Sequence, residues 1–264
     1  MAIITLTTDW GLKDHYLASV KGSLLKEIAN IQIIDISHDI HPFDTYQASY
    51  VLKSAFVNFP DNTIHIIGVN SDASINTPHI AIRCCNQYFI GADNGIFSMM
   101  FSDKSIEIVE LEILQESDKY TFSTKDVFIK AAKKIAEGDD FKSLGNIRTS
   151  IRKAMTFAPV IEMDSNIITI SGKVIYIDRY ENAIININED LFEEYVGNKK
   201  FTINFHSFDD ITEISKSYLD VPAGEICVLF DSNNLMEISM NQGNASSLLG
   251  LTIDTRVRIN IQRN

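Results

Sequence analysis

An aspartate stands where the first apolar segment of the sequence ends, at a position where a carboxylate can bind a ligand. Asp9 follows the run "AIITLTT" at 2–8 and precedes Gly11 and a helix-like segment. If the run is a buried strand of an α/β sheet, Asp9 lies at its carboxyl end, where such sheets bind ligands. The carboxylate can accept hydrogen bonds from both hydroxyls of a ribose, or it can serve only as a helix N-cap.

A second polar segment, "DISHDIHPFD" at 35–44, follows the next apolar run. Its three aspartates and two histidines suggest a metal site. Their spacing matches no common ligand pattern, however, and Pro42 favours a loop. We therefore expect a hydrogen-bonded loop, in which Phe43 is either an apolar wall for a ligand or a core residue.

Two more segments have the small and polar composition of binding loops, "GVNSDASINTPH" at 68–79 and "GADNGIFS" at 91–98. Polar loops at strand ends often carry binding residues. Both segments also have a plain structural interpretation. The first is then a connector, and the second is a turn in which Asp93 or Asn94 caps a helix.

The C-terminal part contains a turn, "DRYEN" at 178–182, whose side chains suit a small polar ligand. Asp178 can hold an ammonium, Tyr180 can stack on a flat ring, and Asn182 can bond to polar edges. Periodicity alone favours an ordinary structural turn.

A later segment, "FDSNNLMEISMNQGNASSLLG" at 230–250, offers Ser232, Glu237 and the small-residue turn "GNA" at 243–245. Backbone groups at such a turn can read an adenine edge. None of these segments specifies a reaction, because the sequence has no nucleophile elbow, phosphate loop or Cys/His arrangement.

The composition is that of an ordinary soluble globular protein. Of 264 residues, 45% are hydrophobic and 22% charged, and the net charge is −12. An acidic surface repels phosphate backbones and anionic lipid, so we expect neither nucleic-acid nor membrane partners. We also expect no signal peptide, because the N-terminus lacks a basic region and a cleavage site. Cys84, Cys85 and Cys227 lack metal-ligand spacing, which indicates reduced thiols in a cytoplasm.

The order of the elements predicts two domains. Apolar runs alternate with amphipathic helices at 14–29, 44–59 and 125–138. This pattern predicts an α/β domain over 1–157 with a central, mostly parallel sheet. Beyond Pro159, short alternating runs predict an all-β, barrel-like domain over 158–264.

Five motifs connect these observations to a known family. In order along the chain they are "ITLTTDWGLKDHYLASVKG", "IIDISHDIHPFD", "GADNG", "YIDRYENAIINI" and "NNLMEISMNQGNASSLLG". Together they resemble the S-adenosyl-L-methionine hydroxide adenosyltransferase family, whose relatives are the bacterial fluorinase and chlorinase. The resemblance implies a homotrimer that holds S-adenosylmethionine between domains of neighbouring subunits. It also implies cleavage to adenosine and methionine without a metal or added cofactor.

The resemblance assigns roles to the residues above. Asp9 is expected to bind the ribose hydroxyls, Asp178 to face the methionine amine, and Phe43 and Tyr180 to flank the ligand. The methionine and adenine ends are assigned to Asn182, Ser232, Glu237, Asn244 and Ala245.

One part of the family pattern is missing. The hydroxide enzymes carry an Asp–Arg–His set that orients or activates water. Asn70, Thr77 or Pro78, and Ser123 stand at the matching positions. Asp72 or His79 is a substitute only if the loop folds differently, and Thr124 matches the halide position of the halogenases.

The sequence therefore predicts an S-adenosylmethionine hydrolase with a rearranged water site at Asn70, Ser123 and Thr124. Two alternatives stay open. One is a protein that binds S-adenosylmethionine or adenosine without turnover, since Asn cannot act as a base. The other is a halogenase-like adenosyltransferase.

Overall fold

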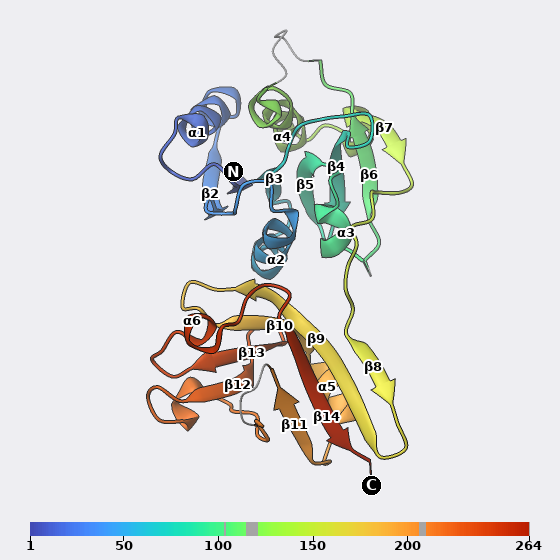
Figure 1. The fold of residues 1–264 in the computed structure, drawn as a ribbon. Coiled ribbons are helices and arrows are strands. Elements are labelled where there is room, and N and C mark those ends of the chain that lie inside the picture. Colours follow the sequence, from blue (N-terminus) through green and yellow to red (C-terminus); the bar gives the residue numbers. More distant parts are fainter. Residues whose placement is uncertain (103, 115–120, 206–209, 264) are drawn as a thin grey trace. The chain divides into compact units, whose positions relative to one another are not determined.

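The computed structural model describes residues 1–102, 104–114, 121–205 and 210–263. The chain divides into two compact units, Met1–Thr156 and Phe157–Asn264, which are described separately (Figure 1).

The first unit is built on a sheet that, in the described residues, has the strand order β2-β1-β3-β5-β4-β6-β7. Its strands are β1 (Ala2–Thr8), β2 (Ile31–Ser37), β3 (Ile64–Gly68), β4 (His79–Cys84), β5 (Gln87–Ala92), β6 (Glu107–Leu111) and β7 (Gly145–Arg148). β2, β1, β3 and β5 run parallel, whereas β4, β6 and β7 pair antiparallel. β4 and β5 are antiparallel because only two residues join them.

Helices cover both faces of this sheet (Figure 1). One face packs against α1 (Tyr16–Glu27), the π-helical turn η1 (Thr124–Phe128) and α4 (Ile129–Glu137), and the other against α2 (Thr45–Phe56) and α3 (Ile96–Met100). The short 3-10 helix η2 (Phe141–Leu144) precedes β7. The Gln47 amide donates to Asp44 Oδ1 over 2.9 Å, so Asp44 is the N-cap of α2.

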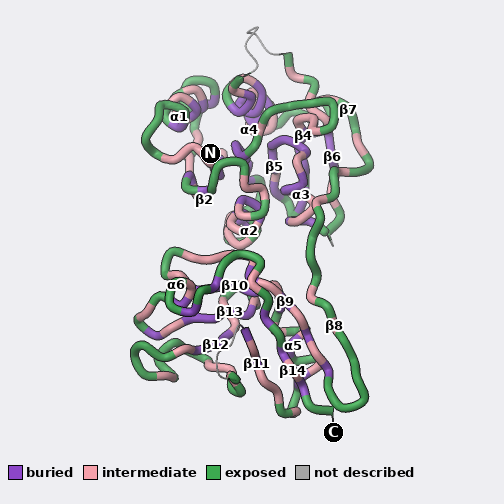
Figure 2. Tube along the Cα trace, in the orientation of Figure 1, coloured by how far each residue is buried: buried purple, intermediate pink, exposed green. Residues whose placement is uncertain are grey.

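The middle strands are the most buried part of the first unit (Figure 2). All of β3 is buried, including His65, whose ring stacks on Phe89 with 4.6 Å between ring centroids. His65 Nδ1 accepts from the Thr5 hydroxyl over 2.7 Å, and Nε2 donates to Gln87 Oε1 over 2.7 Å. Burial lowers the pKa of His65 to about 4, so the ring is neutral at pH 7.

The second unit is a curled antiparallel sheet (Figure 1). Its strands are β8 (Val160–Met163), β9 (Ile167–Ile177), β10 (Ala183–Asn188), β11 (Phe201–Asn204), β12 (Ile226–Phe230), β13 (Leu235–Met240) and β14 (Arg256–Gln262). Three short helices complete it, α5 (Glu189–Tyr195), η3 (Tyr218–Asp220) and α6 (Ala245–Leu249). The long strand β9 pairs with β14 along its first part and with β10 along its last part. A Cβ on Gly172 would lie 2.7 Å from Ile187, so the bend of β9 requires a residue without a side chain.

The two architectures confirm the predicted fold class, an α/β domain followed by an antiparallel, barrel-like β domain. The parallel part of the first sheet is limited to β2, β1, β3 and β5. No helix in the described ranges has the length and apolar character that a membrane span requires.

Candidate functional site

The polar loops of the first unit meet at one edge of its sheet. Thr8, at the end of β1, pairs with Gly68 at the end of β3. The antiparallel strand β4 begins at this edge, because His79 pairs with Ala92 at the end of β5. The segments that follow β1, β2, β3 and β5 and the start of β4 therefore lie together, as expected for a ligand site.

Asp9 is held at this edge by the backbone of the 35–44 loop. The Phe43 amide donates to Asp9 Oδ2 over 2.8 Å, and the Gly11 amide donates to the His38 carbonyl over 2.7 Å. Asp9 Oδ1 does not accept the hydrogen bond from Phe43, so the carboxylate can still accept hydrogen bonds from a ligand. Helix α1 begins at Tyr16 with His15 as its N-cap, so Asp9 is not the cap of that helix.

Phe43 has a backbone φ of 66° and is 71% exposed as a residue. A positive φ is uncommon for a bulky residue and indicates a constrained position. The ring is therefore not a core residue in this chain. The backbone amide of Phe43 bonds to Asp9, and the exposed residue offers apolar surface to a ligand or a partner.

A chain of polar side-chain contacts supports the Asp9 loop. The Thr8 hydroxyl and His38 Nδ1 are 2.8 Å apart, and His38 Nε2 lies 3.0 Å from Asp35 Oδ1. Lys21 Nζ donates to Asp35 Oδ2 over 2.6 Å. Burial raises the pKa of Asp35, but the hydrogen bonds from Lys21 and His38 outweigh it and the pKa is lowered overall. The expected hydrogen-bonded loop is thus present at 35–44.

The loop after β3 is fixed by two side chains from neighbouring segments. Asn94 Nδ2 donates to the carbonyl oxygens of Val69 and Asn70 over 3.1 and 3.0 Å. His79 Nε2 donates to the Ser71 carbonyl over 2.9 Å. Asn70 is exposed and has a φ of 45°, which asparagine tolerates better than most residues.

His79 supports the loop through its ring. Burial lowers its pKa, although the bond to Ser71 and the charge of Asp72 oppose the shift. The ring packs edge-on against Phe128, with 4.9 Å between centroids. Since Nε2 carries the proton donated to Ser71, the neutral ring keeps Nδ1 as an acceptor.

Thr124 contacts the loop that follows β3. It is fully buried at the start of η1, and its hydroxyl donates to the Ser71 hydroxyl over 3.4 Å. Ser123, the preceding residue, is also buried. A Cβ on Gly68 would lie 2.5 Å from the Trp10 ring and 3.2 Å from the Thr124 hydroxyl, so Gly68 permits this close packing. Single π-helical turns occur frequently at functional sites.

In the second unit, Asp178 organises its own turn. Asp178 Oδ1 accepts from the backbone amides of Tyr180 and Asn182 over 2.9 and 2.8 Å, and Oδ2 accepts from Asn182 Nδ2 over 3.1 Å. Asn182 is buried, whereas Tyr180 is 77% exposed as a residue. The turn therefore presents an aromatic ring beside a carboxylate whose position is fixed.

Glu181 joins this turn to the start of α6. Its carboxylate accepts from Asn244 Nδ2 over 3.3 Å and from the Ser247 amide over 3.0 Å. Its carbonyl accepts from the Ser246 amide over 2.8 Å. Hydrogen bonding by Ser247 lowers the pKa of Glu181. The structure thus brings Asp178, Asn182, Asn244 and Ala245 into one connected group.

Glu237 lies in a closed polar cluster on β13. It is 3% exposed and accepts from the hydroxyls of Tyr218, at 2.9 Å, and Ser239. Burial raises its pKa, and the charges of Asp178 and Asp231 add to this effect. Ser232 is exposed in the turn between β12 and β13. Glu237 is therefore held in place by hydrogen bonds from two hydroxyl groups.

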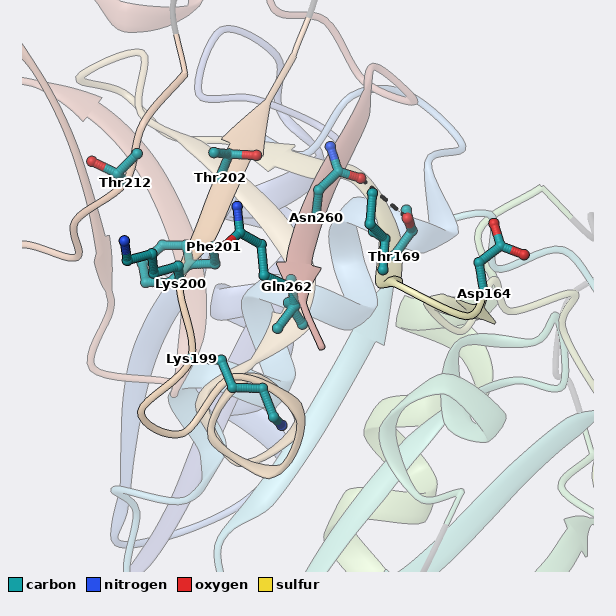
Figure 3. Close-up of a pocket in the computed structure, with 11 residues that line it drawn as sticks. Asp164, Thr169, Lys199, Lys200, Phe201, Thr202, Thr212, Asn260 and Gln262 are labelled. Carbon is teal, nitrogen blue, oxygen red and sulfur yellow. Dashed lines mark hydrogen bonds between the residues drawn. The ribbon is translucent and has the colours of Figure 1, made fainter. Parts of the chain in front are cut away.

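The predicted residues thus form two groups, one in each unit, and two cavities described in the structure contain none of them. A cavity of about 750 Å³ in the second unit is lined mainly by residues in and beside β9, β11 and β14, including Thr169, Thr202 and Asn260 (Figure 3). A cavity of about 400 Å³ lies beside the β4–β5 turn. The candidate site is therefore identified from the strand ends and the hydrogen bonds of the predicted residues, and not from either cavity.

Sequence reasoning missed three residues of the first group, Trp10, Gly68 and Ser71. Trp10 is the single tryptophan of the chain and follows Asp9 directly, which was an available signal. Gly68 and Ser71 carry no signal of their own, because their roles depend on the register of β1 and β3.

The chain is a two-domain protein. An α/β unit with polar loops at one sheet edge is followed by a curled antiparallel β unit. Residues 4–145 match the SAM hydroxide adenosyltransferase N-terminal domain, and residues 172–258 match the C-terminal domain of the same family. The chain belongs to the SAM hydroxide adenosyltransferase family.

Known relatives are similar over nearly the full chain. A Methanocaldococcus jannaschii protein named (R)-S-adenosyl-L-methionine hydrolase is 30% identical, over 94% of this chain and 92% of that protein. A Thermus thermophilus protein of the same name is 26% identical, over 98% and 100%. The crystal structure of an uncharacterized conserved protein from Thermotoga maritima has a TM-score of 0.85 and 28% identity, covering 97% of this chain and 99% of that one.

Proposed function

We propose that this protein hydrolyses S-adenosyl-L-methionine to adenosine and methionine. The observation that carries the proposal is the 30% identity, over nearly the full length, to a protein named (R)-S-adenosyl-L-methionine hydrolase. A net charge of −12 favours a cationic sulfonium substrate over an anionic one.

The reaction requires little covalent chemistry from the protein. The oxygen of a water molecule bonds to C5′ of the ribose while the bond from C5′ to sulfur breaks. The electron pair stays on sulfur, which becomes the neutral thioether of methionine, and the water loses a proton to solvent. Because the sulfonium is already a good leaving group, orientation and partial desolvation of the water supply the catalysis. The proposed reaction uses no metal or added cofactor.

In this mechanism Asp9 binds the ribose hydroxyls and fixes C5′. The bond from the Phe43 amide holds Oδ2 in place and leaves Oδ1 to accept from the substrate. The exposed Phe43 ring covers one side of the ligand. Fixing the carboxylate before binding reduces the entropy lost when substrate is positioned.

The attacking water is placed by hydroxyl groups rather than by an Asp–Arg–His set. The Thr124 and Ser71 hydroxyls are bonded to each other at the same sheet edge as Asp9. Ser123 and the Asn70 side chain complete this water site. These groups orient water without taking its proton, since amides and hydroxyls are weak bases.

The group in the second unit binds the rest of the substrate. Asp178 faces the methionine ammonium, Tyr180 covers the ligand, and Asn182 bonds to its polar edges. Ser232, Glu237 and the Asn244–Ala245 turn serve the methionine and adenine ends. We propose a cytoplasmic homotrimer in which the first group of one subunit meets the second group of a neighbour.

A second candidate function is binding of S-adenosylmethionine without turnover. It is favoured by one observation, the exposed Asn70 at the position where the hydroxide enzymes carry an acid. Such a protein keeps the Asp9 and Asp178 groups and releases no product.

Chromatography of the purified protein with S-adenosylmethionine, in chloride-free buffer and then with chloride, separates these functions. The hydrolase releases equal amounts of adenosine and methionine in both buffers. The binding protein releases neither but co-elutes with its ligand, and a halogenase-like enzyme forms a chlorinated nucleoside only with chloride.

A further inference from the structure

Two adjacent cysteines occupy the turn between β4 and β5, at the end of β5 that is remote from the candidate site. Cys84 ends β4 and is 4% exposed, whereas Cys85 is exposed. Cys85 and Asn86 have φ values of 53° and 58°, as in a two-residue hairpin turn with both central residues left-handed. Such turns favour Asn, Asp and Gly, so turn chemistry does not explain a cysteine here.

The turn brings the two sulfur atoms together. Neighbouring side chains in a strand point to opposite faces, but here Cys84 Sγ and Cys85 Sγ are 3.4 Å apart. The backbone of the turn is anchored, since the Asn62 amide donates to the Asn86 carbonyl over 2.7 Å. The anchored turn therefore holds the two sulfur atoms close together.

The surroundings of Cys85 favour reaction of its sulfur. Lys104 Nζ lies 3.4 Å from Cys85 Sγ, so a cation stands beside the exposed sulfur. Both cysteines line the cavity of about 400 Å³, together with Arg83, Asn86 and Tyr88. A small reagent thus has room to reach Cys85.

We propose that Cys84 and Cys85 form a reactive thiol pair that exchanges with low-molecular-weight disulfides. The Cys85 thiolate attacks one sulfur of the reagent, forms a mixed disulfide and releases one thiol. The Cys84 sulfur then attacks Cys85 Sγ, loses its proton and releases the second thiol. One reagent disulfide is reduced to two thiols, and the cysteine pair is oxidised to one disulfide.

The order of the two steps follows from burial. Burial, and then the neighbouring Cys85, raise the pKa of Cys84 to about 12, so Cys84 stays protonated at pH 7. Exposed thiols that stand next to a resolving cysteine are the common form of redox-sensitive sites. Cys85 therefore reacts first and Cys84 resolves.

The test uses the full-length protein and oxidised glutathione, followed by intact mass and peptide mapping without denaturant. The wild type is expected to gain one glutathione at Cys85 and then lose it as the internal disulfide forms. Cys84→Ser should stop at a stable mixed disulfide, and Cys85→Ser should remain unmodified. Lys104→Gln should slow the first step several-fold.

Cys227→Ser is the matched control, because Cys227 is buried in the other unit, and it should behave as the wild type does. The proposal is overturned if the wild type stays unmodified or ends as a stable mixed disulfide. Reaction of Cys227 as fast as Cys85 would also overturn it, because general thiol exposure would then explain the labelling. Neither result bears on the proposed hydrolase activity.

Discussion

The Thr124 hydroxyl donates a hydrogen bond to the Ser71 hydroxyl over 3.4 Å, which links the first residue of η1 to the loop after β3. Thr124 is fully buried, and its hydroxyl lies close to Gly68. The bond therefore joins two segments at the sheet edge that carries Asp9. In the proposed mechanism these hydroxyls place the attacking water.

Replacing Thr124 with valine tests this role, because valine has the same shape and lacks the hydroxyl. We expect Thr124→Val to lower kcat by about 10- to 100-fold with little change in KM, since misplaced water affects the chemical step. Steady-state kinetics measure both constants. Thr202→Val, a threonine on β11 of the other unit, serves as the control. An unchanged kcat for Thr124→Val would remove the hydroxyl pair from the mechanism.

Asp9 is expected to contribute binding energy through its charge. Asp9→Asn keeps an oxygen for the Phe43 amide but loses the charged acceptor for ribose. Hydrogen bonds to charged groups contribute about 1.5–3 kcal/mol, so kcat/KM should fall by about 10- to 100-fold. Asp39→Asn changes an exposed residue of the 35–44 loop and should leave kcat/KM within about 2-fold of the wild type. Equal losses for both variants would contradict a specific role for Asp9.

The buried His65 predicts a loss of stability in acid. Its pKa is about 4 in the folded protein and 6.5 in the unfolded chain, so the unfolded state binds more protons between these values. The free energy of unfolding should therefore fall as the pH drops from 6.5 to 4, by up to about 3 kcal/mol from this group. Urea unfolding across that range measures it. A His65→Gln variant with the same pH dependence would assign the effect to other residues.

Two threonines of β1 should respond in opposite directions to the loss of their hydroxyls. Within the described residues, the buried Thr7 hydroxyl has no hydrogen-bond partner, whereas Thr5 bonds to His65. Thr7→Val should raise the free energy of unfolding by about 1 kcal/mol, and Thr5→Val should lower it by about 1 kcal/mol or more. Urea unfolding of both variants tests this pair. Destabilisation by Thr7→Val would show that a partner, such as a bound water, is present in solution.

Many elements of the fold could be predicted from the sequence, because hydrophobic periodicity is a property of local sequence. The strand at 2–8 and the helices at 14–29 and 44–59 were predicted close to the positions of β1, α1 and α2. The antiparallel direction of β6 was not predictable in this way, because it depends on long-range pairing with β4.

The site was predictable only where a residue type is informative by itself. Asp9 stands out as a carboxylate at a strand end, and the structure adds its bond to Phe43. The bond between Thr124 and Ser71 joins residues far apart in the sequence, and no local pattern indicates it. Residues such as Ser71 require the three-dimensional register before their chemistry is visible.

The central claim is that water, held at the Asp9 edge, attacks C5′ of S-adenosylmethionine. The most direct measurement is the reaction in water enriched with heavy oxygen, with the mass of the released adenosine determined by spectrometry. We predict that the heavy oxygen appears in the 5′-hydroxyl of adenosine and that Asp9→Asn greatly slows its release. Adenosine without the label, or no adenosine above a protein-free blank, would contradict the claim.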